Sequence, residues 1–266
     1  MRIHAVSDLH IDHAHNRDWL SGLSNYDYQE DVLILGGDIS DDLDRVKWCF
    51  EVVKSRFSAV LFVPGNHDLW VIRDPGITSL DKFDLVENTT QQFDVETSVW
   101  CERDVCIVPF LGWYDYSFGA PGDWLSQRWM DFRACRWPEF NDNPKEISDF
   151  FWQRNQANTS QAMAISSISN KTVISFSHFL PRIDVMPKRI PAEHRRLYPV
   201  LGSQALDTTL REIGSTMHIY GHSHVNRSIF IDEIHYINNA FGYPKETRIA
   251  SKALCCVYGD DSSNEQ

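Results

Sequence analysis

DVLILGGD at residues 31–38 and AVLFVPGNHD at residues 59–68 are two continuous apolar runs, and each ends in glycine and polar residues. Short apolar runs bounded by glycine are typical of strands that are buried on both faces of a sheet. Between them, apolar residues recur at helical spacing over 43–57, after serine and aspartate residues that are suited to cap a helix. With a further strand expected at 2–7, the first quarter of the chain is predicted to be β, β, α, β.

Strands and helices continue to alternate along the rest of the chain. Further strands are expected at 105–109, 172–176, 217–220, 228–231 with 234–237, and 253–258, and helices at about 146–168 and 203–213. This alternation favours an α/β architecture. We expect a single domain over 1–258, with an aromatic-rich insertion at about 75–144 where the pattern is less regular, and a flexible polar tail at 259–266.

Composition and charge exclude several classes of protein. The net charge of −12 argues against binding to extended nucleic acid, which needs basic surface, although a small anionic substrate stays compatible. No apolar run approaches the ~20 residues of a spanning helix, and Asp8 comes too early for a secretory signal. We therefore expect a cytoplasmic protein without a membrane partner. The six cysteines lack CxxC spacing, which favours free thiols over a zinc knuckle or a disulfide framework. The sequence does not indicate an oligomeric state.

Polar residues of metal-binding type follow five of the expected strands. Because ligands gather at the carboxyl ends of strands in α/β sheets, these segments are expected to converge. Residues two apart on an extended or turning backbone point the same way, so each pair can reach one ion or two adjacent ions. A single such pair is more often an ordinary polar strand end, and the prediction rests on finding five segments. They are Asp8-Leu9-His10, Gly37-Asp38, Gly65-Asn66-His67-Asp68, Ser177-His178 and Gly221-His222-Ser223-His224.

In this order the five segments resemble the calcineurin-like metallophosphoesterase superfamily, whose pattern is D-x-H, G-D, G-N-H-[DE], a later H and G-H-x-H. The resemblance implies a four-layer αββα sandwich with two metal ions at the strand ends. It places Asp8, His10 and His224 on the first metal and Asn66, His178 and His222 on the second, with Asp38 bridging the two. The mixed carboxylate, imidazole and amide donors suit transition metals. We expect manganese first, with iron, zinc or nickel as alternatives, each divalent or trivalent.

The same resemblance implies two catalytic residues outside the ligand set. His67 is expected beside the phosphate, where it would stabilise charge or protonate the leaving group, an effect worth about 10²–10⁴-fold. Asp41, three residues after the bridging aspartate, is expected to orient His67. The implied reaction is hydrolysis of a phosphoester by direct attack of a metal-bridging hydroxide, without a covalent intermediate.

The favoured substrate is a small-molecule or nucleotide phosphodiester or monoester, because the G-N-H-D block and the short chain resemble single-domain hydrolases of the superfamily. A protein phosphatase is the first alternative. Protein phosphatases of the superfamily carry arginines at two positions where this chain has Asp42 and Pro64, which disfavours this alternative. A nuclease is the second alternative, which the basic stretch 182–196 keeps open against the acidic overall charge. A non-catalytic scaffold is the third, and it predicts that no metal binds.

Substrate contacts are predicted from two further features. Arg182 opens the basic stretch 182–196 and could clamp a phosphate, although such a run is commonly a solvated loop. The aromatic residues after the strand at 105–109 could stack on a flat group, although aromatic clusters are commonly core. The substrate-binding candidates are Asn66, His67, Arg182, Trp113 and Tyr114.

Overall fold

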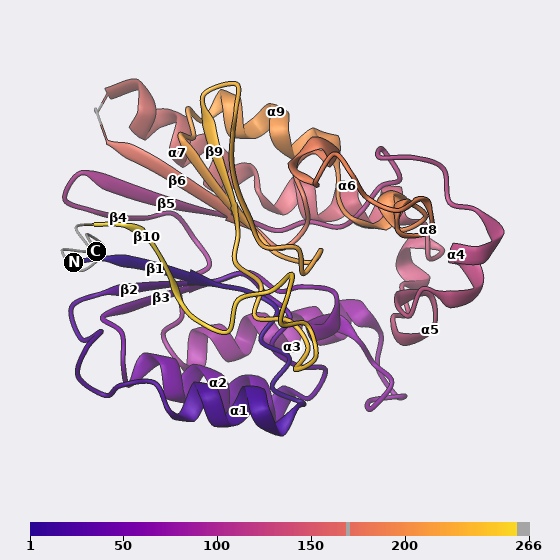
Figure 1. Ribbon diagram of the computed structural model, residues 1–266, viewed down its shortest axis with the longest axis horizontal. Helices are drawn as coiled ribbons and strands as arrows, with labels where there is room; N and C mark the ends of the chain where they lie inside the picture. Colours follow the sequence, from indigo (N-terminus) through magenta and orange to yellow (C-terminus); the bar gives the residue numbers. More distant parts are fainter. Residues whose placement is uncertain (169–170, 260–266) are drawn as a thin grey trace.

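Two β-sheets pack face to face between two layers of helices in the computed structural model, which describes residues 1–168 and 171–259 (Figure 1). This confirms the expected αββα sandwich. The four-stranded sheet has the order β10, β1, β2, β3, and the six-stranded sheet has the order β4, β5, β6, β7, β9, β8. The strands of the first sheet are β1 (Ile3–Val6), β2 (Val32–Leu35), β3 (Ala59–Phe62) and β10 (Cys255–Tyr258). Those of the second are β4 (Trp100–Glu102), β5 (Val105–Phe110), β6 (Thr172–Ser177), β7 (Met217–Tyr220), β8 (Arg227–Ile231) and β9 (Ile234–Asn238).

The continuous apolar runs are explained by burial of both faces of each sheet. In β2, Val32 and Ile34 face the second sheet, where they pack in one cluster with residues of β5 and β6. Leu33 and Leu35 point the opposite way, into a cluster with residues of the helix that follows. Successive side chains of a strand alternate between its faces, and here both faces need apolar residues.

Helices cover the outer face of each sheet, as Figure 1 shows. Beside the four-stranded sheet lie α1 (Ala14–Ser21), α2 (Leu43–Lys54) and α3 (Ser79–Gln92), and beside the six-stranded sheet lie α6 (Pro144–Arg154), α7 (Gln156–Ile168) and α9 (Gln204–Glu212). The single helix expected at 146–168 is thus two helices. Asn155 lies between them, and its side chain bonds both the N–H and the carbonyl of Leu111. None of the helices in the described ranges is long and apolar enough to cross a membrane.

The insertion expected at 75–144 is shorter in the structure, because α3, β4 and β5 belong to the sandwich layers. The chain leaves the sandwich after β5 and forms α4 (Asp123–Arg128), α5 (Asp131–Ala134) and a 3-10 turn, η2 (Pro138–Phe140). Trp113, Tyr114 and Trp137 of this segment pack with residues of α3 and α6 in one buried cluster. Of the tail predicted at 259–266, residues 260–266 lie outside the described residues.

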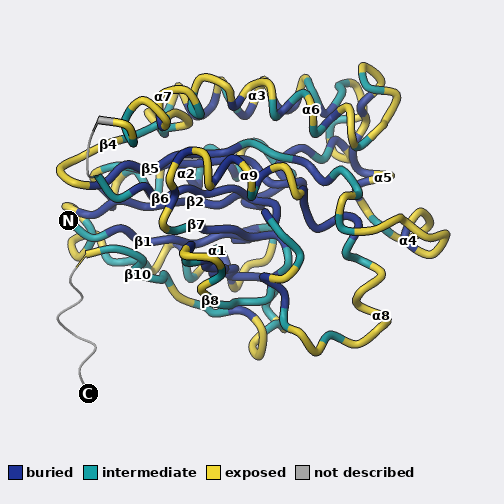
Figure 2. The backbone as a smooth tube through the Cα atoms, turned by 90° about the horizontal axis from the view of Figure 1, so that it is seen from above, coloured by how far each residue is buried: buried dark blue, intermediate teal, exposed yellow. Residues whose placement is uncertain are grey.

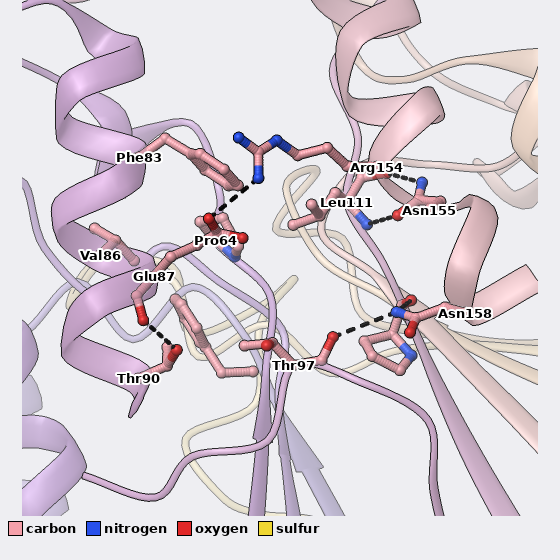
Figure 3. A pocket seen from close by; sticks show the side chains of 12 residues that line it. Pro64, Phe83, Val86, Glu87, Thr90, Thr97, Leu111, Arg154, Asn155 and Asn158 are labelled. Atoms are coloured by element: carbon pink, nitrogen blue, oxygen red, sulfur yellow. Dashed lines mark hydrogen bonds and ion pairs between the residues drawn. The ribbon is translucent and has the colours of Figure 1, made fainter. Parts of the chain in front are cut away.

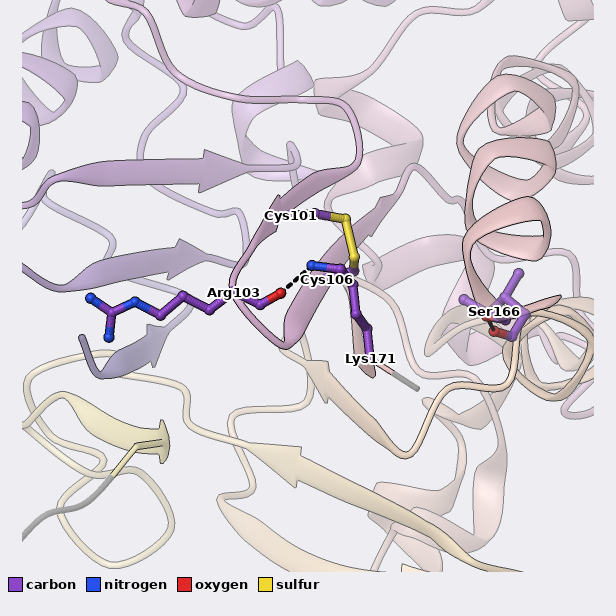
Figure 4. The surroundings of a disulfide bond; sticks show 6 residues. Cys101, Arg103, Cys106, Ser166 and Lys171 are labelled. Carbon is purple, nitrogen blue, oxygen red and sulfur yellow. Dashed lines mark hydrogen bonds between the residues drawn. A yellow bond between two sulfur atoms is a disulfide. The ribbon is translucent and has the colours of Figure 1, made fainter. Parts of the chain in front are cut away.

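A disulfide joins Cys101 and Cys106, which corrects the expectation of free thiols for this pair (Figure 4). The two cysteines lie opposite each other on the antiparallel strands β4 and β5, with Arg103 and Asp104 as the two-residue turn. A hairpin with so short a turn brings residues five apart into a cross-strand pair. The pair therefore depends on the hairpin rather than on a cysteine motif.

Candidate metal centre

The predicted metal ligands converge at the carboxyl edge of the two sheets. Asp8 follows β1, Asp38 follows β2, and Asn66 follows β3, while His178 follows β6 and the His222 segment follows β7. All seven predicted donors, including His10 and His224, are at most 9% exposed. Parallel strands bring their carboxyl ends to one edge, so residues up to 216 positions apart along the chain meet here.

The donor atoms form two adjacent groups that share one carboxylate. Asp38 belongs to both groups, and within each group the donor atoms lie within 4.8 Å of one another. Asn66 adjoins the second group, because its Oδ1 lies 3.2 Å from His178 Nε2. The first group is Asp8, His10, Asp38 and His224, and the second is Asp38, His178 and His222. This is the arrangement that a two-ion site with one bridging aspartate requires.

Three of the histidines are oriented by a contact at the ring nitrogen that faces away from the other donors. Because a carbonyl or carboxylate oxygen accepts, that nitrogen carries the proton and donates. The contacts are His178 Nδ1 to Gly36 O at 2.8 Å, His222 Nε2 to Val200 O at 3.0 Å, and His224 Nδ1 to Glu246 Oε2 at 2.7 Å. His178 Nε2 and His222 Nδ1 are then lone pairs only 3.2 Å apart. Two facing lone pairs at this distance fit a shared cation, so the donor set suits a metal.

The backbone at the donors is held in the left-handed region. Five of the seven donors have positive φ, from 41° at His10 to 66° at His222, and the others are Asp8, Asp38 and His224. This conformation costs a non-glycine residue about 1–3 kcal/mol, and it persists where the surroundings enforce it. The enforcing contacts are visible: His222 N–H donates to the Asp8 carboxylate at 3.0 Å, and His10 N–H donates to the Asp38 carbonyl at 3.0 Å. Such strain is typical of a functional site.

Asp68 ties together the two loops that follow β2 and β3. Its carboxylate is fully buried. It accepts hydrogen bonds from the N–H groups of Asp38, Ile39 and Gly65 at 2.8, 2.9 and 2.8 Å. Burial raises the pKa of Asp68 to about 6, against the lowering effect of these bonds. Asp68 therefore fixes the position of the shared donor, Asp38.

Burial sets the protonation of the donors in the protein alone. It raises the pKa of Asp38 well above its ordinary value, and neighbouring Asp8 raises it further. It lowers the pKa values of His10 and His222 well below the ordinary value of histidine. His224 differs: although burial lowers its pKa, Asp8 and then Glu246 raise it to about 10. Most of the imidazoles are thus neutral and ready to bind a cation, which would displace the proton of His224.

His67 lies at the edge of this donor cluster, and its predicted partner lies elsewhere. Its N–H donates to Asp38 Oδ1 at 2.9 Å, and its ring stacks on Trp70 with 3.6 Å between ring centroids. Burial, and then the neighbouring His178, lowers the pKa of His67 to about 3. The Asp41 carboxylate instead pairs with Arg73 Nε at 2.7 Å. Within residues 1–168 and 171–259, no hydrogen bond or ion pair joins Asp41 to His67, so Trp70 orients the ring.

A cavity of about 330 Å³ opens above the donor cluster, and its aromatic lining differs from the prediction. The rings at the cavity belong to Trp70, Trp129 and Tyr243. Trp113 and Tyr114 are only 2% and 1% exposed, because they pack in the aromatic cluster behind the cavity. They are core residues, and the expectation that they line the entrance is wrong.

Arg182 is also placed away from the cavity. Its guanidinium bonds Asp184 at 2.6 Å and lies 3.5 Å from Asp207 and 3.3 Å from Asp232. Three carboxylates therefore occupy the group that was expected to clamp a phosphate. The basic stretch alone could not indicate these contacts, because the acidic partners lie up to 50 residues further along the chain.

Two residues that orient the donors were not expected from the sequence. Asp131 accepts from Asn66 Nδ2 at 2.8 Å, from Trp70 Nε1 at 2.7 Å and from Trp129 Nε1 at 2.8 Å. Glu246 accepts from His224. Asp131 begins the short helix α5 and Glu246 lies in an irregular segment, and neither belongs to a motif. Donor-orienting carboxylates of this kind are common around protein metals.

A second hollow, of about 170 Å³, lies between α3 and the α6–α7 pair (Figure 3). Glu87 and Arg154 face each other across it, 3.3 Å apart, with Phe83 and Asn158 beside them. None of the metal-binding candidates lines it. The chemistry of the described residues is therefore concentrated in the cavity above Asp38.

A sandwich of this type, with paired donor groups at its strand ends, defines a metal-dependent phosphoester hydrolase. The chain belongs to the calcineurin-like phosphoesterase family, whose model matches residues 1–226. It is 27% identical over 266 residues to the acyl-carrier-protein phosphodiesterase PptH of Mycobacterium tuberculosis, covering 92% of this chain and 78% of that one. It is 23% identical to the uncharacterized protein L509 of Acanthamoeba polyphaga mimivirus, over 91% of both chains.

The fold comparison agrees with the family. The crystal structure of the phosphopantetheinyl hydrolase PptH from Mycobacterium tuberculosis superposes with a TM-score of 0.83 at 24% identity, covering 100% of this chain and 98% of that chain. The family and the buried histidine and aspartate groups together make this protein a metal-dependent hydrolase of phosphoesters.

Proposed function

We propose that this protein is a dinuclear-metal phosphodiesterase that cleaves the phosphodiester between a phosphopantetheine arm and a carrier protein. The observation that carries the proposal is the position of Asp38, whose carboxylate belongs to both donor groups. The substrate class follows the relative PptH, which is named as an acyl-carrier-protein phosphodiesterase and a phosphopantetheinyl hydrolase. Identity of 27% across most of both chains supports a shared substrate class.

The proposed ligands of one ion are Asp8, His10 and His224, those of the other are Asn66, His178 and His222, and Asp38 serves both. Manganese is the first candidate, with iron, zinc and nickel as alternatives. When bound, two such cations lower the pKa of a shared water and polarise the phosphoryl oxygens. The protein contributes orientation, because its own carbonyls and carboxylates fix the imidazole rings before any ion arrives.

Side chains around the donors would position the ester and keep out water. His67 lies 3.9 Å from Asp38 and lines the cavity, which suits a group that stabilises charge on the phosphate or its leaving group. Tyr243 stacks on His10 with centroids 4.5 Å apart and closes one side. Trp129 meets His222 edge-on at 5.8 Å and closes another. Met130, Leu197 and Leu201 give the outer cavity an apolar wall that suits an aliphatic arm.

The substrate is tested by comparing esters on the purified, manganese-loaded protein. Phosphopantetheinyl carrier protein, bis-p-nitrophenyl phosphate, nucleotide diesters, a monoester, RNA and DNA are supplied in parallel. We expect the carrier protein to lose its phosphopantetheine arm, as followed by mass spectrometry. Turnover of a nucleotide diester with none of the carrier protein would instead favour the small-molecule alternative.

Cytoplasmic location stays a prediction.

The bridging role is tested with Asp38→Asn and a matched control. Both Asp38 and Asp94 have left-handed backbone, with φ of 58° and 54°, which asparagine tolerates. Asp94 is exposed, so Asp94→Asn makes the same chemical change away from the site. We expect Asp38→Asn to lose bound metal and turnover together while Asp94→Asn keeps both. Full activity in Asp38→Asn would refute the shared ligand.

A further inference from the structure

A basic surface borders the mouth of the metal cavity. It is formed by Arg128 of α4, by Arg195 of α8 (Ala192–Arg195), and by Arg196, and we call these three residues the arginine rim. All three are exposed. Arg128 lines the cavity itself. Figure 2 shows α4 and α8 together at the end of the molecule opposite the N-terminus, outside the layered body.

Two arginines of the rim, one from α4 and one next to α8, contact the same tryptophan ring. The Arg128 guanidinium lies over the Trp124 ring at 5.9 Å from its centroid, and that of Arg196 lies over the same ring at 5.8 Å. Trp124 is 38% exposed. Guanidinium groups held against an aromatic ring are partly fixed in place, so less freedom is lost when they bind an anionic partner.

The three arginines of the rim differ from other arginines of the protein in their lack of carboxylate partners among the described residues. No ion pair involving its three arginines occurs in the part of the chain that the structure describes, whereas nearby Arg182 and Arg211 share Asp207 and Asp232. The protein as a whole carries a net charge of −12. Unneutralised positive charge is thus placed beside the cavity in an otherwise acidic protein, which favours an acidic partner.

A groove of about 380 Å³ lies between α4 and α8. Neighbouring residues of the chain line the two hollows. Leu197 lines the cavity, and Arg196 and Tyr198 on either side of it line the groove. On α4, Arg128 lines the cavity and Trp124 lines the groove. Exposed Met130 and Phe132 lie next to these walls along the chain. Arginine, tryptophan, methionine and phenylalanine are the residue types that protein interfaces favour.

We propose that the arginine rim and the groove form the docking surface for an acidic carrier protein whose phosphodiester enters the metal cavity. The inference rests on the proposed function, because it places the protein side of that substrate. When the carrier protein docks at the groove, its phosphopantetheine arm would pass Arg128 and Leu197 to reach the donors. A protein fits better than a nucleic acid, because a base would compete with two guanidinium groups for the Trp124 ring and three arginines are too few for a phosphate track.

The test compares Arg196→Glu with Lys47→Glu, which makes the same charge change at a partly exposed position of α2. Binding of phosphopantetheinyl carrier protein is measured by calorimetry at two salt concentrations, and turnover of bis-p-nitrophenyl phosphate is measured on the same samples. We expect Arg196→Glu to weaken carrier-protein binding roughly tenfold and to flatten its salt dependence, with unchanged turnover of the small diester. Lys47→Glu should behave as the unmodified protein.

Each other outcome has a defined meaning. Equal binding by both variants overturns the docking surface, as does loss of small-diester turnover in Arg196→Glu, since the residue would then act within the site. A carrier protein that binds through Arg196 but is not cleaved supports the docking surface and refutes the proposed function. An RNA oligonucleotide that binds through Arg196 where the carrier protein does not overturns the proposal in favour of nucleic acid.

Discussion

The Asn66 side-chain amide donates a 2.8 Å hydrogen bond to the Asp131 carboxylate. An amide has one donor end and one acceptor end, so this bond turns Asn66 Oδ1 toward His178 Nε2, 3.2 Å away. Asp131 is itself fixed by the indole N–H groups of Trp70 and Trp129. The segment after β5 thereby determines which atom of Asn66 faces the second donor group.

Asp131→Asn is expected to weaken metal binding. In the unmodified protein three N–H groups donate to the Asp131 carboxylate. The amide of asparagine has only one oxygen, so its NH2 group must face at least one of these donors, and Asn66 loses its fixed orientation. Loss of such a supporting contact costs about 10–100-fold in metal affinity or activity. Affinity is measured by titration against a competing chelator, with exposed Asp123→Asn of α4 as the control. Unchanged affinity in Asp131→Asn would show that Asn66 does not depend on this bond.

His67→Ala is expected to keep its metal and lose catalysis. The ring contacts Trp70 and His10 at the edge of the donor cluster and belongs to neither donor group. A residue that acts only on the phosphate or its leaving group contributes about 10²–10⁴-fold to kcat. Metal content and kcat are measured together, with exposed His15→Ala as the control. A variant that lost its metal would move His67 into the ligand set.

Asp41→Asn tests whether this carboxylate orients His67 or only pairs with Arg73. The residue pairs with Arg73, which is half exposed, and an exposed ion pair contributes about 0–1 kcal/mol. Because Asp41 makes no hydrogen bond or ion pair with His67 among the described residues, we expect kcat to stay close to that of the unmodified protein, with a loss of about 0–1 kcal/mol in unfolding free energy. The double variant with His67→Ala provides the contrast. If Asp41 acted through His67, the single change would reproduce the loss seen in His67→Ala and the two losses would not add.

The fold and the convergence of the candidate donors could be predicted because their signals are local. Each buried strand is a short apolar run, and each donor follows such a run directly, as Asp38 follows β2. The helix α3 was missed although Thr78 and Asp81 form a capping box at its start. Polar side chains dominate α3, so its apolar face was not evident from the sequence.

The orienting contacts could not be predicted because they exist only after folding. Glu246 meets His224 across 22 positions of the chain, with β8 and β9 between them, and Asp131 meets Asn66 across 65. The substrate candidates failed for a related reason. A tryptophan has the same composition signal in a core as at a pocket, and an arginine does not reveal how many distant carboxylates surround it.

Trp113 and Trp129 give the final prediction, because both lie in the segment after β5 but only Trp129 lines the cavity. Trp113 is buried and meets Trp137 and Phe179 edge-on, each with centroids 5.3 Å apart, so Trp113→Ala should cost about 3–5 kcal/mol of unfolding free energy. Trp129 lines the cavity, so Trp129→Ala should raise KM for the ester with a smaller loss of stability. Urea midpoints and KM values are measured for both. A raised KM and unchanged stability in Trp113→Ala would return that residue to the substrate site.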